Sequence, residues 1–165
     1  MTHSTATIAM AICAVIAAGL APAMATSNDE IISENAAQAC QLSLPTIDTK
    51  VSPRATGFRN DGTANVFVIC GTSAPTDDND FLGGTALWLY STSAQDVTVN
   101  CTFVTGTVGT YVYSTASLPL PAGSDPDRIW QGFPGGAYNV TVTCTLPPKV
   151  AILRTESSYA LNVGA

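Results

Sequence analysis

Asn139–Pro148 reads NVTVTCTLPP, and the alternation of apolar and threonine side chains along it decides the fold. Successive side chains of an extended chain point to opposite faces, so the pattern predicts a strand with one buried face. A second run, Val97–Val104, repeats it, with Val99, Cys101 and Phe103 on the apolar side. The sequence therefore predicts two strands whose cysteines, Cys101 and Cys144, both face the core.

Further short runs with strand character are separated by glycine, proline and other turn residues. They are Thr85–Ser91, Asp96–Val104, Thr110–Ser117, Asp127–Phe133, Tyr138–Leu146, Val150–Thr155 and Ser158–Val163. Earlier in the chain, Arg59–Gly62 reads RNDG and predicts a hairpin turn between Arg54–Phe58 and Ala64–Gly71. About seven to nine short strands at this spacing predict an all-β fold, an antiparallel β-sandwich of immunoglobulin-like or jelly-roll-like type.

Residues 1–25 resemble a secretory signal peptide, with an apolar run from Ala6 to Leu20 and an A-x-A ending at Ala25. About 15 apolar residues are too few to span a bilayer, which takes roughly 20. We therefore expect a secreted or periplasmic protein that begins at Thr26 and has no membrane span. Residues 26–39 follow as a short helix or a flexible segment, because Ser27 and Glu30 have capping-box spacing, and residues 40–165 form the sandwich domain.

Four cysteines follow the predicted leader, an even number in a compartment where thiols oxidise. Two disulfides are therefore expected, and three pairings are possible. The matching strand patterns favour Cys101–Cys144, which leaves Cys40–Cys70, although the spacing alone does not fix the connectivity.

The composition excludes several classes of function. With 12 acidic against 6 basic residues, the chain lacks the basic footprint of a nucleic-acid-binding protein. Its single histidine, His3, lies in the predicted leader, so imidazole-dependent nucleophile activation and imidazole metal ligation are both excluded. The sequence therefore predicts a protein that is not an enzyme.

The loop 72–84 contains the densest acidic group, formed by Asp77, Asp78 and Asp80. Consecutive acids beside glycine and asparagine are typical of a solvated loop tip. A weak calcium site is the alternative, and it would need further oxygen ligands because the spacing is not that of an EF-hand. No other cofactor is expected.

Aromatic residues supply the only candidate binding surface. Trp88 and Tyr90 alternate with Leu87 and Leu89, and Tyr111 and Tyr113 flank Val112. If the aliphatic sides face the core, the four rings face solvent, where flat rings can hold a sugar or a partner's apolar patch. We expect Trp130 to lie in the core.

Several stretches together resemble a loose group of small secreted bacterial proteins of unknown function. They are ATGFRNDG at 55–62, VFVICG at 66–71, VTVNCTF at 97–103 and VTVTCTLPPKVAIL at 140–153. The resemblance implies a β-sandwich and transfers no catalytic residue.

Two functions remain open from the sequence. The first is a non-enzymatic structural or interaction domain with an unknown protein partner. The alternative is a carbohydrate- or ligand-binding module that uses the exposed aromatic face, with calcium as a possible aid. The exposure of the aromatic rings distinguishes the two.

Overall fold

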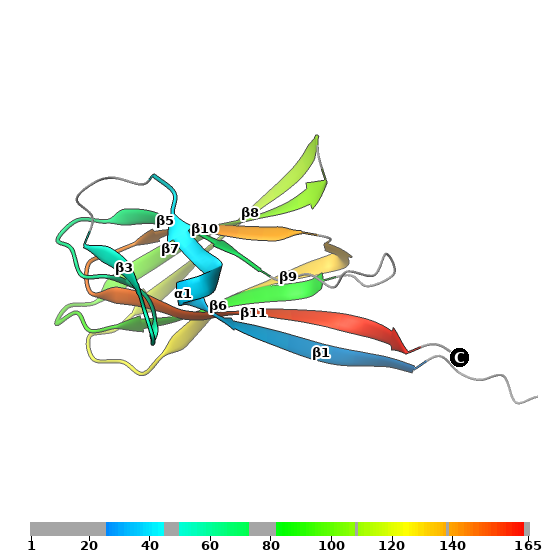
Figure 1. The fold of residues 1–165 in the computed structure, drawn as a ribbon, viewed down its shortest axis with the longest axis horizontal. Coiled ribbons are helices and arrows are strands. Elements are labelled where there is room, and N and C mark those ends of the chain that lie inside the picture. Colours follow the sequence, from blue (N-terminus) through cyan, green and yellow to red (C-terminus); the bar gives the residue numbers. More distant parts are fainter. Residues whose placement is uncertain (1–25, 45–49, 73–81, 108, 138, 164–165) are drawn as a thin grey trace, which may run out of the picture.

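The computed structural model describes residues 26–44, 50–72, 82–107, 109–137 and 139–163, and the predicted leader lies outside them. Within these residues the chain forms eleven strands and one short helix (Figure 1). The strands make two antiparallel sheets that pack face to face, which confirms the predicted all-β sandwich. The strand number exceeds the expected seven to nine because the N-terminal part and residues 40–60 also pair into the sheets.

We call the six-stranded sheet sheet A. Its strands are β1 (Thr26–Asn35), β3 (Val51–Arg54), β4 (Gly57–Asn60), β6 (Leu82–Ser91), β9 (Asp127–Ala137) and β11 (Val150–Val163). Their order is β3-β4-β11-β6-β9, and β1 pairs with β11.

The five-stranded sheet is sheet B. Its strands are β2 (Cys40–Leu42), β5 (Val66–Gly71), β7 (Val97–Thr107), β8 (Thr110–Leu120) and β10 (Val140–Leu146). Their order is β2-β5-β10-β7-β8. The β7–β8 hairpin and the β1–β11 pair extend from the same end of the molecule (Figure 1).

The core lies between the two sheets and is filled by the apolar members of the alternating patterns. On β10 the side chains of Val140, Val142, Cys144 and Leu146 are buried, as the opening pattern predicts. Phe103 of β7 and Leu87 of β6 are fully buried as well. Burial of each large apolar side chain contributes about 1.5–3 kcal/mol to folding.

Both predicted disulfides are present, Cys40–Cys70 and Cys101–Cys144. Each joins residues that lie directly opposite each other on neighbouring antiparallel strands, β2 with β5 and β7 with β10. Both bonds therefore cross-link strands within sheet B.

The predicted helical or flexible segment at residues 26–39 is corrected by the structure. Thr26–Asn35 is strand β1, paired along its whole length with β11 from Thr26↔Val163 to Asn35↔Arg154. Only Ala36–Ala39 is helical, as α1, and its N-cap is Asn35, whose side chain accepts a hydrogen bond from the Ala37 amide. A capping-box spacing is a local signal, and here long-range pairing with β11 overrides it.

The predicted hairpin turn at RNDG is also wrong, because this segment carries the chain from β4 in sheet A to β5 in sheet B. Asn60 is fully buried there. Its amide nitrogen donates to the carbonyl oxygens of Ala64 and Leu146, both at 2.9 Å, and its Oδ1 accepts from the Gly62 amide. The asparagine therefore satisfies backbone groups at the crossing between sheets instead of favouring a tight turn.

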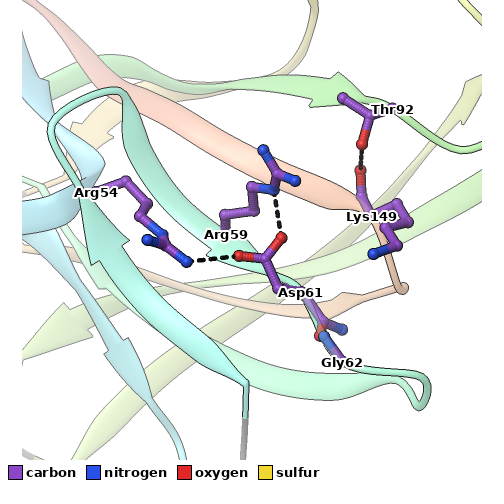
Figure 2. A network of polar contacts seen from close by, with 7 residues as sticks. Arg54, Arg59, Asp61, Gly62, Thr92 and Lys149 are labelled. Carbon is purple, nitrogen blue, oxygen red and sulfur yellow. Dashed lines mark hydrogen bonds and ion pairs between the residues drawn. The ribbon is translucent and has the colours of Figure 1, made fainter.

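Asp61 makes an ion-pair cluster beside this crossing (Figure 2). Its carboxylate contacts Arg54 at 2.9 Å and Arg59 at 2.6 Å. The hydrogen bond from Arg54, together with the charges of both arginines, lowers the pKa of Asp61. The folded state therefore favours the ionised carboxylate.

We expect Asp61→Asn to lower the melting temperature at neutral pH, with a difference from wild type that shrinks in acid. A depressed folded-state pKa stabilises the fold above the unfolded-state pKa, and this contribution disappears as the pH falls through the folded-state pKa. Thermal melts from about pH 7 down to about pH 2 measure it. Asp125→Asn, in the exposed loop after β8, is the charge-matched control, and an Asp61→Asn deficit that is constant with pH would contradict the expectation.

Candidate functional site

Both tryptophans of the chain lie on the outer face of sheet A. On β6, Leu87 and Leu89 are fully buried, so Trp88 between them points outward. On β9, Ile129 takes the buried position and Trp130 is 46% exposed. The expectation that Trp130 lies in the core is therefore wrong, because its neighbour Ile129 fills the inward position of the alternation.

The Trp130 indole packs against the backbone of β6 at Gly84. A Cβ atom built on Gly84 of β6 would collide with Cζ2 of the Trp130 ring, and it would lie 2.6 Å from Cη2 and 3.0 Å from Cε2. Three ring atoms that close to one backbone position place the benzo ring of the indole directly over Gly84. The backbone at Gly84 therefore supports the indole, and Trp130 remains 46% exposed.

We expect Gly84→Ala to displace the Trp130 indole while the sandwich stays folded. The added methyl group cannot fit under a ring that already contacts the Gly84 backbone. The tryptophan fluorescence and the side-chain NMR signals of Trp130 report the displacement. Gly83→Ala is the matched control because its Cβ would meet only ordinary contacts with Ser158, the shortest at 3.5 Å. Equal spectra for the two variants would contradict the stacking of Trp130 on Gly84.

Two arginines flank the indoles. The register places Arg154 of β11 and Arg128 of β9 on either side of Trp88. The guanidinium of Arg154 lies 4.5 Å from the centroid of the Trp88 ring, and that of Arg128 lies 5.6 Å from it. Arg128 also lies 5.8 Å from the Trp130 ring. Cation–π attraction at these distances keeps both arginine side chains against the outer surface of sheet A.

Glu156 of β11 forms an ion pair with each of the two arginines. Its Oε1 lies 2.9 Å from Nε of Arg154, and its Oε2 lies 3.9 Å from Nη1 of Arg128. The glutamate is almost completely buried, while about half of each arginine side chain is exposed. We call this set, Trp88, Arg128, Trp130, Arg154 and Glu156, the indole–arginine face.

A depression of about 260 Å³ opens at one side of the indole–arginine face. Its lining consists of Ile31, Arg128, Trp130, Glu156 and Ser158. It combines one aromatic ring, one exposed aliphatic side chain and hydrogen-bonding groups of both polarities, a mixture typical of small-ligand sites.

The four aromatic residues singled out in the sequence do not form one surface. Trp88 and Tyr90 share the outer face of sheet A. Tyr111 and Tyr113 lie on β8 of sheet B, where they are 55% and 67% exposed. Val112 between them is exposed too, because this part of the β7–β8 hairpin has no core on either side.

The acidic group Asp77, Asp78 and Asp80 lies outside the described residues. Among the residues that the structure does describe, no group of three or more histidine, cysteine, aspartate or glutamate side chains is arranged to hold a metal ion. Calcium binding by the 72–84 loop stays a prediction from the sequence.

Sequence reasoning missed Arg128, Arg154 and Glu156. The signal for Arg128 is present in the sequence: Arg128 and Trp130 flank the aliphatic Ile129 just as Trp88 and Tyr90 flank Leu89. No such alternation marks Arg154 and Glu156 in the sequence. The reason is that β11 shifts its pairing register with β6 between Ile152 and Arg154.

Comparisons with known proteins identify no family. No protein-family profile matches the chain, and no curated protein matches it. No helix among the described residues is long and apolar enough to cross a membrane.

Two solved structures are similar to parts of the chain at low identity. One is a GH26-CBM35 beta-(1,4)-mannanase from Podospora anserina, with 10% identity and a TM-score of 0.46. The match covers 77% of this chain and only 27% of the mannanase. The other is a family 11 carbohydrate-binding module from Clostridium thermocellum in complex with a beta-1,3-1,4-mixed-linked tetrasaccharide, with 12% identity, a TM-score of 0.37, and coverage of 82% of this chain and 89% of the module.

Proposed function

We propose that the protein is an exported, non-catalytic binding module that holds a saccharide ring against Trp130. The observation that carries this proposal is the position of the Trp130 indole, which lies over Gly84 on one side and is 46% exposed. A flat ring fixed by the backbone presents a large apolar surface at little cost in side-chain entropy.

The groups around Trp130 suit a polyhydroxylated ligand. Arg128 has guanidinium donors, Glu156 has carboxylate acceptors, and Ser158 has a hydroxyl group that does both. Ile31 adds an exposed apolar side chain at the opposite side of the depression. A sugar has one apolar ring face and a rim of hydroxyl groups, which matches this arrangement of apolar and polar groups.

Export and the lack of catalysis are parts of the same proposal. Two disulfides are typical of proteins in oxidising compartments, which agrees with the secretory leader expected at residues 1–25. No histidine follows residue 3, so catalysis that depends on an imidazole has no residue to carry it out. Glu156, the carboxylate at the indole–arginine face, is engaged by Arg154 and is better suited to binding than to proton transfer.

Intrinsic fluorescence tests the proposal, because both tryptophans of the chain belong to the indole–arginine face. A glycan array identifies oligosaccharides that bind, and titration of each hit should change the tryptophan emission. Trp130→Ala should weaken binding, followed through Trp88, at least about tenfold, or about 1.4 kcal/mol. Tyr111→Ala, an exposed ring on the other sheet, should leave the affinity unchanged. If every array hit binds the Trp130→Ala protein as tightly as wild type, or if no hit changes the emission, this site is contradicted.

A second candidate function is the protein-interaction domain that the sequence also suggests. The observation that favours it is the exposed run Tyr111–Tyr113 on the β7–β8 hairpin, where three consecutive apolar or aromatic side chains face solvent. In that case binding to a protein partner would depend on Tyr111 and Tyr113 and would not depend on Trp130.

A further inference from the structure

Sheet B contains no charged residue in any of its five strands. The sequences are CQL in β2, VFVICG in β5, VTVNCTFVTGT in β7, TYVYSTASLPL in β8 and VTVTCTL in β10. Solvent-facing strand positions in most proteins include charged side chains, which keep the surface soluble and protect sheet edges. The polar side chains on the outer face of sheet B are therefore all uncharged and carry hydroxyl or amide groups.

These groups line a groove of about 330 Å³ on the outer face of sheet B, at the lower end of the range of small-ligand sites. The register arranges the outward-facing residues of β5, β10, β7 and β8 in two rows across the strands, and all of them except Ile69 line the groove. One row is Phe67–Thr145–Asn100–Ser117, and the next is Ile69–Thr143–Thr102–Thr115. Phe67 closes one end of the first row with a ring that is 55% exposed.

The floor of the groove is fixed before any ligand binds. Cys101 lines the groove, and its disulfide to Cys144 holds β7 and β10 in register beneath the two rows. The Ser117 hydroxyl donates to Oδ1 of Asn100 at 2.6 Å, which orients the amide so that its nitrogen remains a donor. A site whose backbone and amide are already held loses little entropy when a ligand binds.

We propose that this groove is a second binding site, independent of Trp130, and that its ligand is an uncharged polysaccharide chain. An anionic or cationic ligand would give up its hydration without meeting an opposite charge. A purely apolar ligand would leave the hydroxyl groups of Thr102, Thr143 and Thr145 without partners. A neutral sugar chain offers hydroxyl groups that donate and accept along the rows, and an apolar ring face that can pack on Phe67.

The test uses the full chain with Trp130→Ala, so that the site on sheet A does not contribute. Its mobility is measured by affinity electrophoresis in gels containing hydroxyethylcellulose, galactomannan or dextran, with polygalacturonate as the anionic comparison. We expect retardation by at least one neutral polymer and none by polygalacturonate. Adding Thr143→Lys, in the middle of the groove, should reduce the affinity at least tenfold. Thr98→Lys, which adds the same charge on the same face outside the groove lining, should change it less than twofold.

Any one of three results would overturn the second site. The first is that the Trp130→Ala protein passes all three neutral gels unretarded, and the second is that Thr143→Lys binds like Thr98→Lys. The third is that light scattering shows two copies of the chain joined through the groove and separated by Thr143→Lys. The first result, with wild type still retarded, leaves the Trp130 site intact. Retardation that is lost in Thr143→Lys and unchanged by Trp130→Ala would support the groove and count against the function proposed for Trp130.

Discussion

Replacing Cys101 and Cys144 together by alanine will lower the free energy of unfolding by about 4 kcal/mol. The bond closes a loop between residues that are 43 positions apart, and the chain-entropy model assigns that stabilisation to the restricted unfolded chain. Net stabilities of single domains are only about 5–15 kcal/mol, so this loss is a large share of the total.

Urea denaturation at neutral pH, with Cys40–Cys70 kept oxidised, measures this loss. The midpoint should fall and the m-value should rise, since an unfolded chain without the bond exposes more surface. Cys40→Ala with Cys70→Ala is the matched comparison, because it opens a loop of similar length, 30 positions, at the edge strand β2. A loss below about 1 kcal/mol for the Cys101–Cys144 pair, without a change in m-value, would show that the unfolded chain is not restricted by this bond.

Gly57→Ala should destabilise the fold by at least about 3 kcal/mol, through backbone strain and a collision together. Gly57 has a φ of 132°, a conformation that side chains with a Cβ rarely adopt. A Cβ there would also collide with the carbonyl oxygen of Ile152 and lie 2.9 Å from Cα of Leu153, both on the neighbouring strand β11. Backbone atoms in the middle of a sheet cannot move aside without breaking strand pairing.

Gly71→Ala provides the control for this substitution. Gly71 ends β5, and a Cβ built on it meets nothing within 4 Å. Thermal and urea unfolding of the two variants side by side should therefore show a large loss for Gly57→Ala and a change within about 0.5 kcal/mol for Gly71→Ala. Similar values for both would mean that β4 can separate from β11 at little cost.

The sequence predicted those parts of the fold in which apolar and polar side chains alternate regularly. The Val/Thr pattern of β10 and the matching pattern of β7 predicted the buried cysteines, and the structure joins them directly across the strands. The N-terminal segment failed because β1 has no such alternation, and its strand is formed by pairing with β11, more than a hundred residues away. Local sequence propensity carries no information about a pairing strand that is so far away along the chain.

The candidate site was only partly predictable for the same reason. Alternation shows which side chains share a face of one strand, and it placed Trp88 with Tyr90 correctly. It does not show which sheet a strand joins, so the rings of β6 and β8 could not be separated in advance. The partners of Trp88, which are Arg128 and Arg154, depend on the order β11-β6-β9 and on the register shift in β11.

The pairing of β1 with β11 has a mechanical consequence. Thr26 and Val163 lie opposite each other at the outer end of this antiparallel pair, so a force that separates them loads the hydrogen bonds one after another. Sheet A would open by peeling from that end at low tension. In sheet B, each disulfide is a covalent tie between neighbouring strands, so the same tension would leave β2 attached to β5 and β7 attached to β10. A stretched molecule would thus lose the support beneath Trp130 before the floor of the threonine-lined groove.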